Sequence, residues 1–175
     1  MKGLVHVYTG DGKGKTTAAI GLGIRACGHG MKVLMIQFLK SMPTGEVTAL
    51  ERLAPLFELH RGAESRNFTW NMNVEERKAA IIEQKELFDY TIEQAASDRW
   101  DMIILDEIMA AVDQEMISPE DVISMIKARP DRLEVVLTGR KAPGGFTDIA
   151  DYVSDIRCFR HPMEKGISPR RGIEF

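Results

Sequence analysis

The chain has 175 residues, enough for one domain of ordinary size whose core needs neither a metal nor a disulfide for stability. Its 26 acidic and 23 basic residues give a formal charge of −3, which argues against a surface that binds nucleic acid throughout but not against a local anion site. Cys27 and Cys158 lie far apart and outside any CxxC pair, which excludes a disulfide framework and a zinc site built from cysteines.

The sequence carries no signal for export or membrane insertion. No stretch of about 18 apolar residues is present, and the first residues lack the length and the small-residue cleavage site of a signal peptide. We therefore expect no membrane partner and, from the charge balance, no nucleic-acid partner. Because its thiols are not arranged for disulfide bonding, we expect the protein to be cytoplasmic.

Short apolar runs alternate with longer segments of helical periodicity, which is typical of a mostly parallel sheet flanked by helices. No repeat, low-complexity tract or linker divides the chain, so we expect residues 1–175 to form a single domain. In chain order, the sequence predicts a strand at 3–8, a helix at 15–27, a strand at 32–38, a weaker strand near 56–59, a long helix from 73 to 96, a strand at 102–105, a helix between 118 and 130, a strand at 133–137 and a last strand at 153–159.

Capping residues support two of the predicted helices. Asn73 is placed to cap the long helix, with Glu76 three residues later in the position of a capping box. Ser118 and Pro119 suit the N-cap and first positions of the later helix, which Pro130 ends. The long helix is the most clearly defined element of the sequence.

The segment from 39 to 73 has no clear periodicity and contains Arg61, Arg66, Phe68 and Trp70. Long irregular segments in compact domains are often functional. Phe68 and Trp70 allow two interpretations. Large aromatic residues most often serve core packing, whereas the arginine and asparagines that flank this pair favour a binding edge.

A glycine-rich loop connects the first predicted strand to the first predicted helix. It consists of Thr9, Gly10, Asp11, Gly12, Lys13, Gly14, Lys15, Thr16 and Thr17. Glycines let the backbone turn its N–H groups inward at the positive end of a helix, which predicts binding of a nucleoside triphosphate. Lys15 adds a positive charge, and the Thr16 hydroxyl is placed to ligate Mg²⁺. The usual pattern has glycine where this loop has Thr9, a departure that Gly10 and Gly12 partly compensate.

Two carboxylates follow the apolar run at 102–105. Asp106 and Glu107 stand at the carboxyl end of a predicted parallel strand, which faces the same crevice as the loop. An acid in this position can hold Mg²⁺ directly or through water. The alternative is that one carboxylate only caps a helix that begins near Ile108. Because neighbouring strand residues point to opposite sides, the two acids should have different roles.

Several short motifs occur in order along the chain. They are the glycine-rich loop with the alanines that follow it, Gln-Phe-Leu-Lys at 37–40, Phe-Thr-Trp at 68–70, Leu-Asp-Glu at 105–107, Thr-Gly-Arg at 138–140 and Gly-Ile-Glu-Phe at 172–175. Together they resemble the CobA/CobO/BtuR family of ATP:corrinoid adenosyltransferases, from residue 3 to residue 175. The loop is shared with many unrelated enzymes, whereas Phe-Thr-Trp combined with the C-terminal motif is much more specific.

The resemblance implies a single-domain P-loop fold of the RecA-like α/β class, usually found as a homodimer. It also implies a reaction in which the 5′-deoxyadenosyl group of ATP is transferred to the Co(I) of a corrinoid and triphosphate is released. The corrinoid would be cobalamin or an a,c-diamide precursor. ATP, Mg²⁺, the corrinoid and an electron-donor protein are the implied ligands and partners.

By the same resemblance, residues 9–17 hold the triphosphate, and Lys15 and Glu107 are the catalytic residues. Thr16 and Glu107 contact Mg²⁺ with Asp106 nearby, and Arg140 belongs to the nucleotide site. Phe68 and Trp70 correspond to an aromatic pair that faces the corrinoid and helps to displace its lower axial ligand.

Three features depart from the family pattern. The chain begins almost at its first strand, where many relatives have an extension that helps to cover the corrinoid. Ser41 replaces a common glycine, and residues 167–171 differ from the usual sequence before the C-terminal motif. These departures bear on corrinoid affinity more than on the class of reaction.

Two other functions compete with this interpretation. A P-loop nucleotide kinase or NTPase needs only the loop and the acidic strand end, although the zinc-ribbon cysteines common in thymidine kinases are absent from the sequence. A non-enzymatic nucleotide-binding or regulatory module is the third possibility, and the acidic composition argues against one that acts on nucleic acid.

Overall fold

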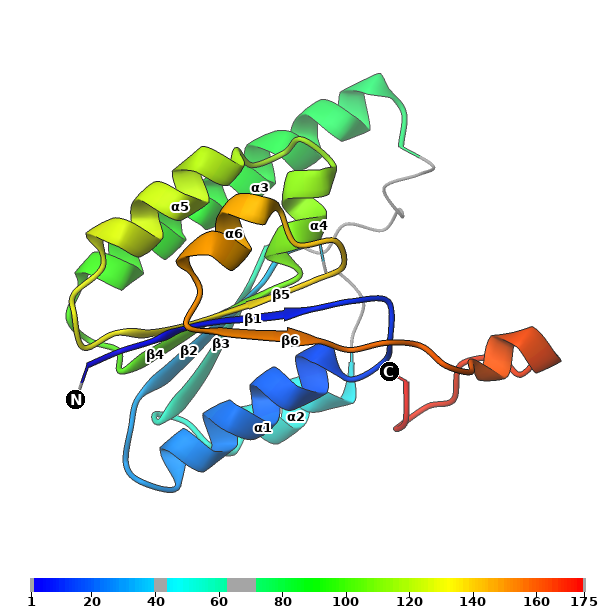
Figure 1. Cartoon of the computed structure of the whole chain (residues 1–175), viewed down its shortest axis with the longest axis horizontal. Helices are drawn as coiled ribbons and strands as arrows, with labels where there is room; N and C mark the ends of the chain where they lie inside the picture. The colour runs from blue at the N-terminus through cyan, green and yellow to red at the C-terminus, as the bar shows by residue number, and fades with distance from the viewer. Residues whose placement is uncertain (1, 40–43, 63–71, 175) are drawn as a thin grey trace.

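A computed structural model of the chain describes residues 2–39, 44–62 and 72–174. Its strands are β1 (Val5–Thr9), β2 (Val33–Gln37), β3 (Phe57–Arg61), β4 (Met102–Asp106), β5 (Glu134–Thr138) and β6 (Tyr152–Asp155). All of them pair in parallel, and together they form one sheet in the order β3-β2-β4-β5-β1-β6 (Figure 1). β2 and β4 are buried along their whole length, since each has a strand on both sides and helices over both faces.

Helices cover the two faces of the sheet. α1 (Lys15–Cys27) and α2 (Gly45–Glu51) lie on one face, whereas α3 (Val74–Ala96), α4 (Ile108–Asp113), α5 (Pro119–Ala128) and α6 (Gly144–Ile149) lie on the other (Figure 1). A separate hydrophobic cluster fills each interface. The predicted α/β class is therefore confirmed. No helix in the described part of the chain is long and apolar enough to cross a membrane.

The predicted caps are present. The Asn73 side chain accepts a hydrogen bond from the Glu76 N–H at 2.9 Å, and the Glu76 carboxylate accepts one from the Asn73 N–H at 2.8 Å. Ser118 caps α5, with Pro119 as its first residue. α1 has the predicted bounds, Lys15–Cys27. Local signals were sufficient for these helices because each signal involves residues only a few positions apart.

Of the three short helices, only α4 was anticipated, since one alternative for the acidic strand end was a cap on a helix that begins near Ile108. α2, α4 and α6 have six or seven residues each, too few for a hydrophobic period to be recognised. The irregular segment from 39 to 73 contains α2 and β3 among its described residues. Arg66, Phe68 and Trp70, like Ser41, lie outside the described residues.

The predicted last strand, 153–159, is wrong in its second half, because β6 ends at Asp155. Its partner β1 ends at Thr9, which pairs with Asp155, so the sheet offers no further strand to pair with. Phe159, which the apolar pattern assigned to this strand, is 90% exposed. Beyond Asp155 the chain instead follows the glycine-rich loop, and this position makes it part of the candidate site.

Candidate functional site

The glycine-rich loop, residues 9–17, lies between β1 and α1 at the carboxyl end of the parallel sheet (Figure 1). Gly10 has φ 101° and Gly14 has φ 124°, in the region that favours glycine over residues with a side chain. Gly14 occupies the N-cap position of the thirteen-residue helix α1. Backbone N–H groups at the start of such a helix are suited to binding an anion.

The chain after β6 packs directly against this loop. The Gly12 N–H donates to the Ile156 carbonyl at 2.7 Å, and the Ile156 N–H donates to the Thr9 carbonyl at 2.9 Å. A Cβ atom at Gly10 or Gly12 would lie 2.4 or 2.7 Å from the Ile156 carbonyl oxygen. Both positions therefore require glycine, because the backbone at Ile156 lies too close for a side chain. No local feature of the loop predicts this contact.

The amine of Lys15 lies inside the loop. The residue is only 7% exposed, and Nζ donates to the carbonyls of Gly10 at 2.7 Å and Gly12 at 2.8 Å. Burial lowers the pKa of Lys15, while the negative charge of Glu107 raises it and the positive charge of Arg140 lowers it further. The loop thus holds one cation close to the backbone groups that can receive an anion.

Asp106 is completely buried at the end of β4 and is surrounded by donors. Its Oδ1 accepts from the hydroxyls of Thr16 at 2.8 Å and Thr138 at 2.7 Å, and its Oδ2 accepts from the Gln37 amide at 3.1 Å. This carboxylate therefore holds the Thr16 hydroxyl of the loop in position through a hydrogen bond.

Glu107 has different surroundings from Asp106. Its backbone is left-handed, with φ 62°, and it occupies the N-cap position of α4 without a hydrogen bond from its side chain to the helix. Its N–H donates to the Thr138 hydroxyl at 3.0 Å. A left-handed residue other than glycine is uncommon. Here it places the Glu107 side chain on the wall of a cleft rather than in a helix cap.

This cleft brings most of the predicted site together. It has a volume of about 590 Å³, within the range of about 300–1,000 Å³ that is usual for small-molecule sites. It is lined by Asp11, Gly12, Lys13, Gly14, Lys15, Thr16, Thr17, Glu107 and Arg140, together with Ile20, Thr44, Gly45, Glu46, His161, Gly172, Ile173 and Glu174. Among the predicted residues, Thr9, Gly10 and Asp106 support the cleft from outside, while Phe68 and Trp70 lie beyond the described part of the chain.

Sequence reasoning missed several residues of the cleft. It assigned no role to His161 or to residues 172–174, although it singled out the latter as a motif. Residues 44–46 were marked only as part of the irregular segment from 39 to 73. Sequence reasoning also missed that the Cys158 N–H donates to the Asp11 carboxylate at 3.0 Å, a hydrogen bond that lowers the pKa of Asp11. The only signal that could have pointed to residues 172–174 was their motif, which does not indicate what they contact.

The oxygen donors of the cleft fit Mg²⁺. Among residues 2–39, 44–62 and 72–174, no three His, Cys, Asp or Glu side chains form a metal cluster. Magnesium does not require one, since one or two carboxylates together with substrate phosphates and water usually bind it. A threonine hydroxyl and a carboxylate, Thr16 and Glu107, line the same cleft, with Asp106 directly behind Thr16.

Substitution of Asp106 by asparagine is expected to affect activity more than stability. Gln37 Oε1 is buried and has no hydrogen-bond partner in the described structure, so the Gln37 amide can turn to accept from the new Asn N–H. Asp106→Ala instead leaves several buried donors unpaired, at a cost of about 1–3 kcal/mol each. We expect Asp106→Asn to retain most of the unfolding free energy while the Mg²⁺ requirement rises about 10–100-fold.

Urea unfolding and Mg²⁺ titration of activity test this prediction. Asp106→Ala serves as the comparison, because it removes the acceptor altogether and should be clearly less stable. An Asp106→Asn protein with an unchanged Mg²⁺ requirement would show that Asp106 is only a structural acceptor.

The whole chain is similar to proteins of known class. The family model described as ATP:corrinoid adenosyltransferase BtuR/CobO/CobP matches residues 1–175. A corrinoid adenosyltransferase of Escherichia coli (strain K12) is 34% identical over 175 residues, which cover 99% of this chain and 86% of the relative. Corrinoid adenosyltransferase CobA of Salmonella typhimurium (strain LT2) is 35% identical with the same coverage. A corrinoid adenosyltransferase of Pseudomonas aeruginosa is 33% identical and is covered to 84% of its length.

Proposed function

The chain belongs to the family of ATP:corrinoid adenosyltransferases, and on this premise we propose that it transfers the 5′-deoxyadenosyl group of ATP to the cobalt of a reduced corrinoid. In this reaction the electron pair of Co(I) attacks C5′ of the ribose. The electron pair of Co(I) becomes the new cobalt–carbon bond. The bond from C5′ to the α-phosphate oxygen breaks, and triphosphate leaves with the electron pair of that broken bond. Cobalt is formally oxidised from Co(I) to Co(III).

Because Co(I) is itself a strong nucleophile, the protein need not supply a serine, cysteine or histidine for the attack. Its tasks are to place C5′ in line with cobalt and to stabilise the charge that develops on the departing triphosphate. The observation that best supports this assignment is the cleft in which the amine of Lys15, the start of α1 and the Arg140 side chain converge.

Mg²⁺ would supply further neutralisation of the triphosphate charge when it is bound. Thr16 and Glu107 are the residues that would hold it, because both have side-chain oxygens and both line the same cleft. Asp106 would keep the Thr16 hydroxyl in position through the hydrogen bond of 2.8 Å. The donors are hard oxygen ligands, the type that Mg²⁺ prefers.

The corrinoid would lie against Phe68 and Trp70, a proposal that rests on the family motif. An aromatic pair there would help to displace the lower axial ligand, leaving a four-coordinate Co(II) that is easier to reduce. We therefore expect Trp70→Ala to impair turnover from cob(II)alamin more than turnover from chemically reduced cob(I)alamin. Trp70→Phe is the matched control, since it keeps an aromatic ring. Equal losses with both substrates would contradict the axial-ligand role.

One assay separates this function from that of a P-loop kinase or NTPase. The protein is incubated with Mg-ATP and chemically reduced cob(I)alamin, and the phosphorus-containing product is identified. Inorganic triphosphate together with a new cobalt–carbon bond is the expected result. ADP and phosphate with an unchanged corrinoid would instead establish the kinase or NTPase activity.

The proposal extends to the domain organisation, oligomeric state, electron donor and location of the enzyme. Residues 1–175 would act as one catalytic domain, which the family match over the same residues supports. The enzyme would work as a homodimer and receive electrons from a donor protein that reduces the corrinoid. A cytoplasmic location is consistent with its two free thiols, Cys27 and Cys158.

A further inference from the structure

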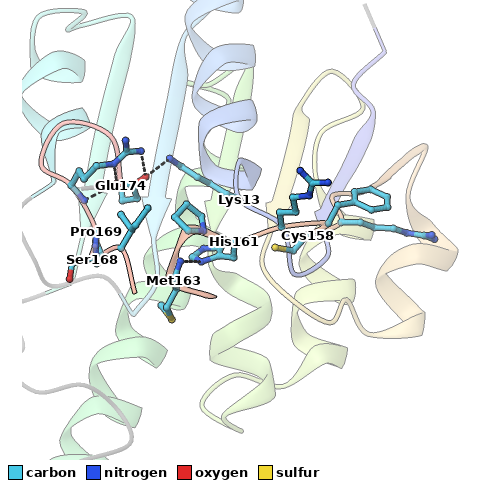
Figure 2. Close-up of a pocket in the computed structure, with 13 residues that line it drawn as sticks. Lys13, Cys158, His161, Met163, Ser168, Pro169 and Glu174 are labelled. Atoms are coloured by element: carbon cyan, nitrogen blue, oxygen red, sulfur yellow. Dashed lines mark hydrogen bonds and ion pairs between the residues drawn. The ribbon is translucent and has the colours of Figure 1, made fainter. Parts of the chain in front are cut away.

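The last described residues of the chain return to the glycine-rich loop, where the side chain of Lys13 contacts them. Lys13 Nζ donates to the Ile173 carbonyl at 3.1 Å and lies 3.2 Å from Glu174 Oε1 (Figure 2). These partners are about 160 positions apart in the sequence. Lys13 thereby connects the loop to the segment 170–174, which we call the tail.

The tail holds the Glu174 carboxylate in a fixed position. Glu174 Oε2 accepts from the Arg170 N–H at 2.7 Å, and Oε1 accepts from Arg170 Nη2 at 3.0 Å. Gly172, with φ 78°, makes the turn that brings these two residues together. The hydrogen bond from the Arg170 side chain is the main reason that the pKa of Glu174 falls to about 2. Glu174 is therefore negatively charged throughout the neutral range of pH.

A carboxylate in this place is unexpected for a site that receives phosphates. Lys13 and Glu174 both line the cleft that contains Lys15 and Thr16. They also line a second cavity of about 420 Å³, so the Lys13–Glu174 ion pair (Figure 2) borders both spaces. A triphosphate in the loop would be attracted by Lys13 and repelled by Glu174.

We propose that Glu174 is a positioning residue that competes with triphosphate for Lys13 and so weakens the binding of the triphosphate product. The inference rests on the proposed function, since it assumes that the loop holds triphosphate. When Lys13 turns toward a phosphate, its contact with Glu174 is lost, and when that contact re-forms, triphosphate is released more readily. Because binding couplings are reciprocal, triphosphate also loosens the tail from the loop.

Calorimetric titration with inorganic tripolyphosphate and Mg²⁺, without a corrinoid, tests this inference. Glu174→Gln keeps the shape and an acceptor oxygen for Arg170 but removes the charge. We expect it to bind tripolyphosphate roughly two- to fivefold more tightly than the wild type, the range that an exposed ion pair supports. The difference should be larger at about 50 mM than at about 500 mM salt, because salt screens it.

Two further variants show whether the effect passes through Lys13. Glu164→Gln removes an equal charge from the exposed helix Pro162–Lys165, which does not line the cleft, and should bind tripolyphosphate like the wild type. In a Lys13→Gln background, Glu174→Gln should lose most of its tightening effect, since the cation for which the two anions compete is gone.

The outcomes distinguish this inference from the function on which it rests. If the wild type binds tripolyphosphate and Glu174→Gln binds it no more tightly, the competition is disproved while the phosphate site stands. The competition would also be disproved if Glu174→Gln increased the affinity for tripolyphosphate equally with and without Lys13. Glu174 would then act on the phosphate by its own charge alone. Failure of the wild type to bind tripolyphosphate would overturn the phosphate assignment of the loop and this inference together.

Discussion

Replacement of Lys15 by alanine is expected to lower kcat/KM for ATP by about 10²–10³-fold, the usual effect of removing one preorganised charge-stabilising group. Its amine is buried in the loop and contacts two loop carbonyls, at 2.7 and 2.8 Å, so no exposed lysine can replace it. Negative charge develops on the triphosphate as the C5′–O bond breaks. The loss should therefore appear in kcat as well as in KM.

Steady-state kinetics with Mg-ATP and pre-reduced cob(I)alamin measure this effect, and the triphosphate product should fall in proportion. Lys127→Ala is a matched control, since Lys127 is an exposed lysine of α5, on the opposite face of the sheet from α1. Thermal unfolding of both variants separates a local change in the loop from loss of the fold. Activity of Lys15→Ala close to that of the wild type would refute a role for the amine in the reaction.

Replacement of Glu107 by glutamine is expected to lower kcat/KM by about 10²-fold and to raise the Mg²⁺ concentration needed for half-maximal activity. Glutamine has the same shape but offers a neutral oxygen, which is a weaker ligand for a hard cation. The left-handed backbone at residue 107 tolerates either residue to a similar degree, so the fold should be preserved.

Glu107→Gln should also change the pH dependence in a defined direction. Burial already lowers the pKa of Lys15, and the charge of Glu107 opposes that shift. Without this charge the pKa of Lys15 falls further, so its amine loses its proton at a lower pH. The alkaline limb of the kcat/KM profile should therefore move to lower pH if the charged amine is required.

The chain offers a close control for this variant. Glu115 is another glutamate with a left-handed backbone, at φ 58°, and it is exposed and does not line the cleft. Glu115→Gln should match the wild type in Mg²⁺ requirement and pH profile. If Glu107→Gln and Glu115→Gln behaved alike, Glu107 would have no part in holding Mg²⁺.

The two acids at the end of β4 illustrate how far sequence reasoning reaches. Their position after an apolar run predicted that both would lie near the glycine-rich loop, and they do. The alternation of strand side chains also suggested different surroundings for the two. What separates them in the structure, however, is the left-handed turn at Glu107, where the backbone N–H donates to Thr138 on a neighbouring strand.

The sequence by itself determined the features that depend on neighbouring residues: the α/β pattern, the cap formed by Asn73 and Glu76, and a strand, loop and helix around Lys15. Such features follow from backbone preferences and from hydrogen bonds that span only a few positions. Only the tertiary structure decided that Ile156 packs on the loop and that Glu174 contacts Lys13. These contacts depend on β6 lying beside β1 at the edge of the sheet, and strand order is set by the packing of the whole chain rather than by any local pattern.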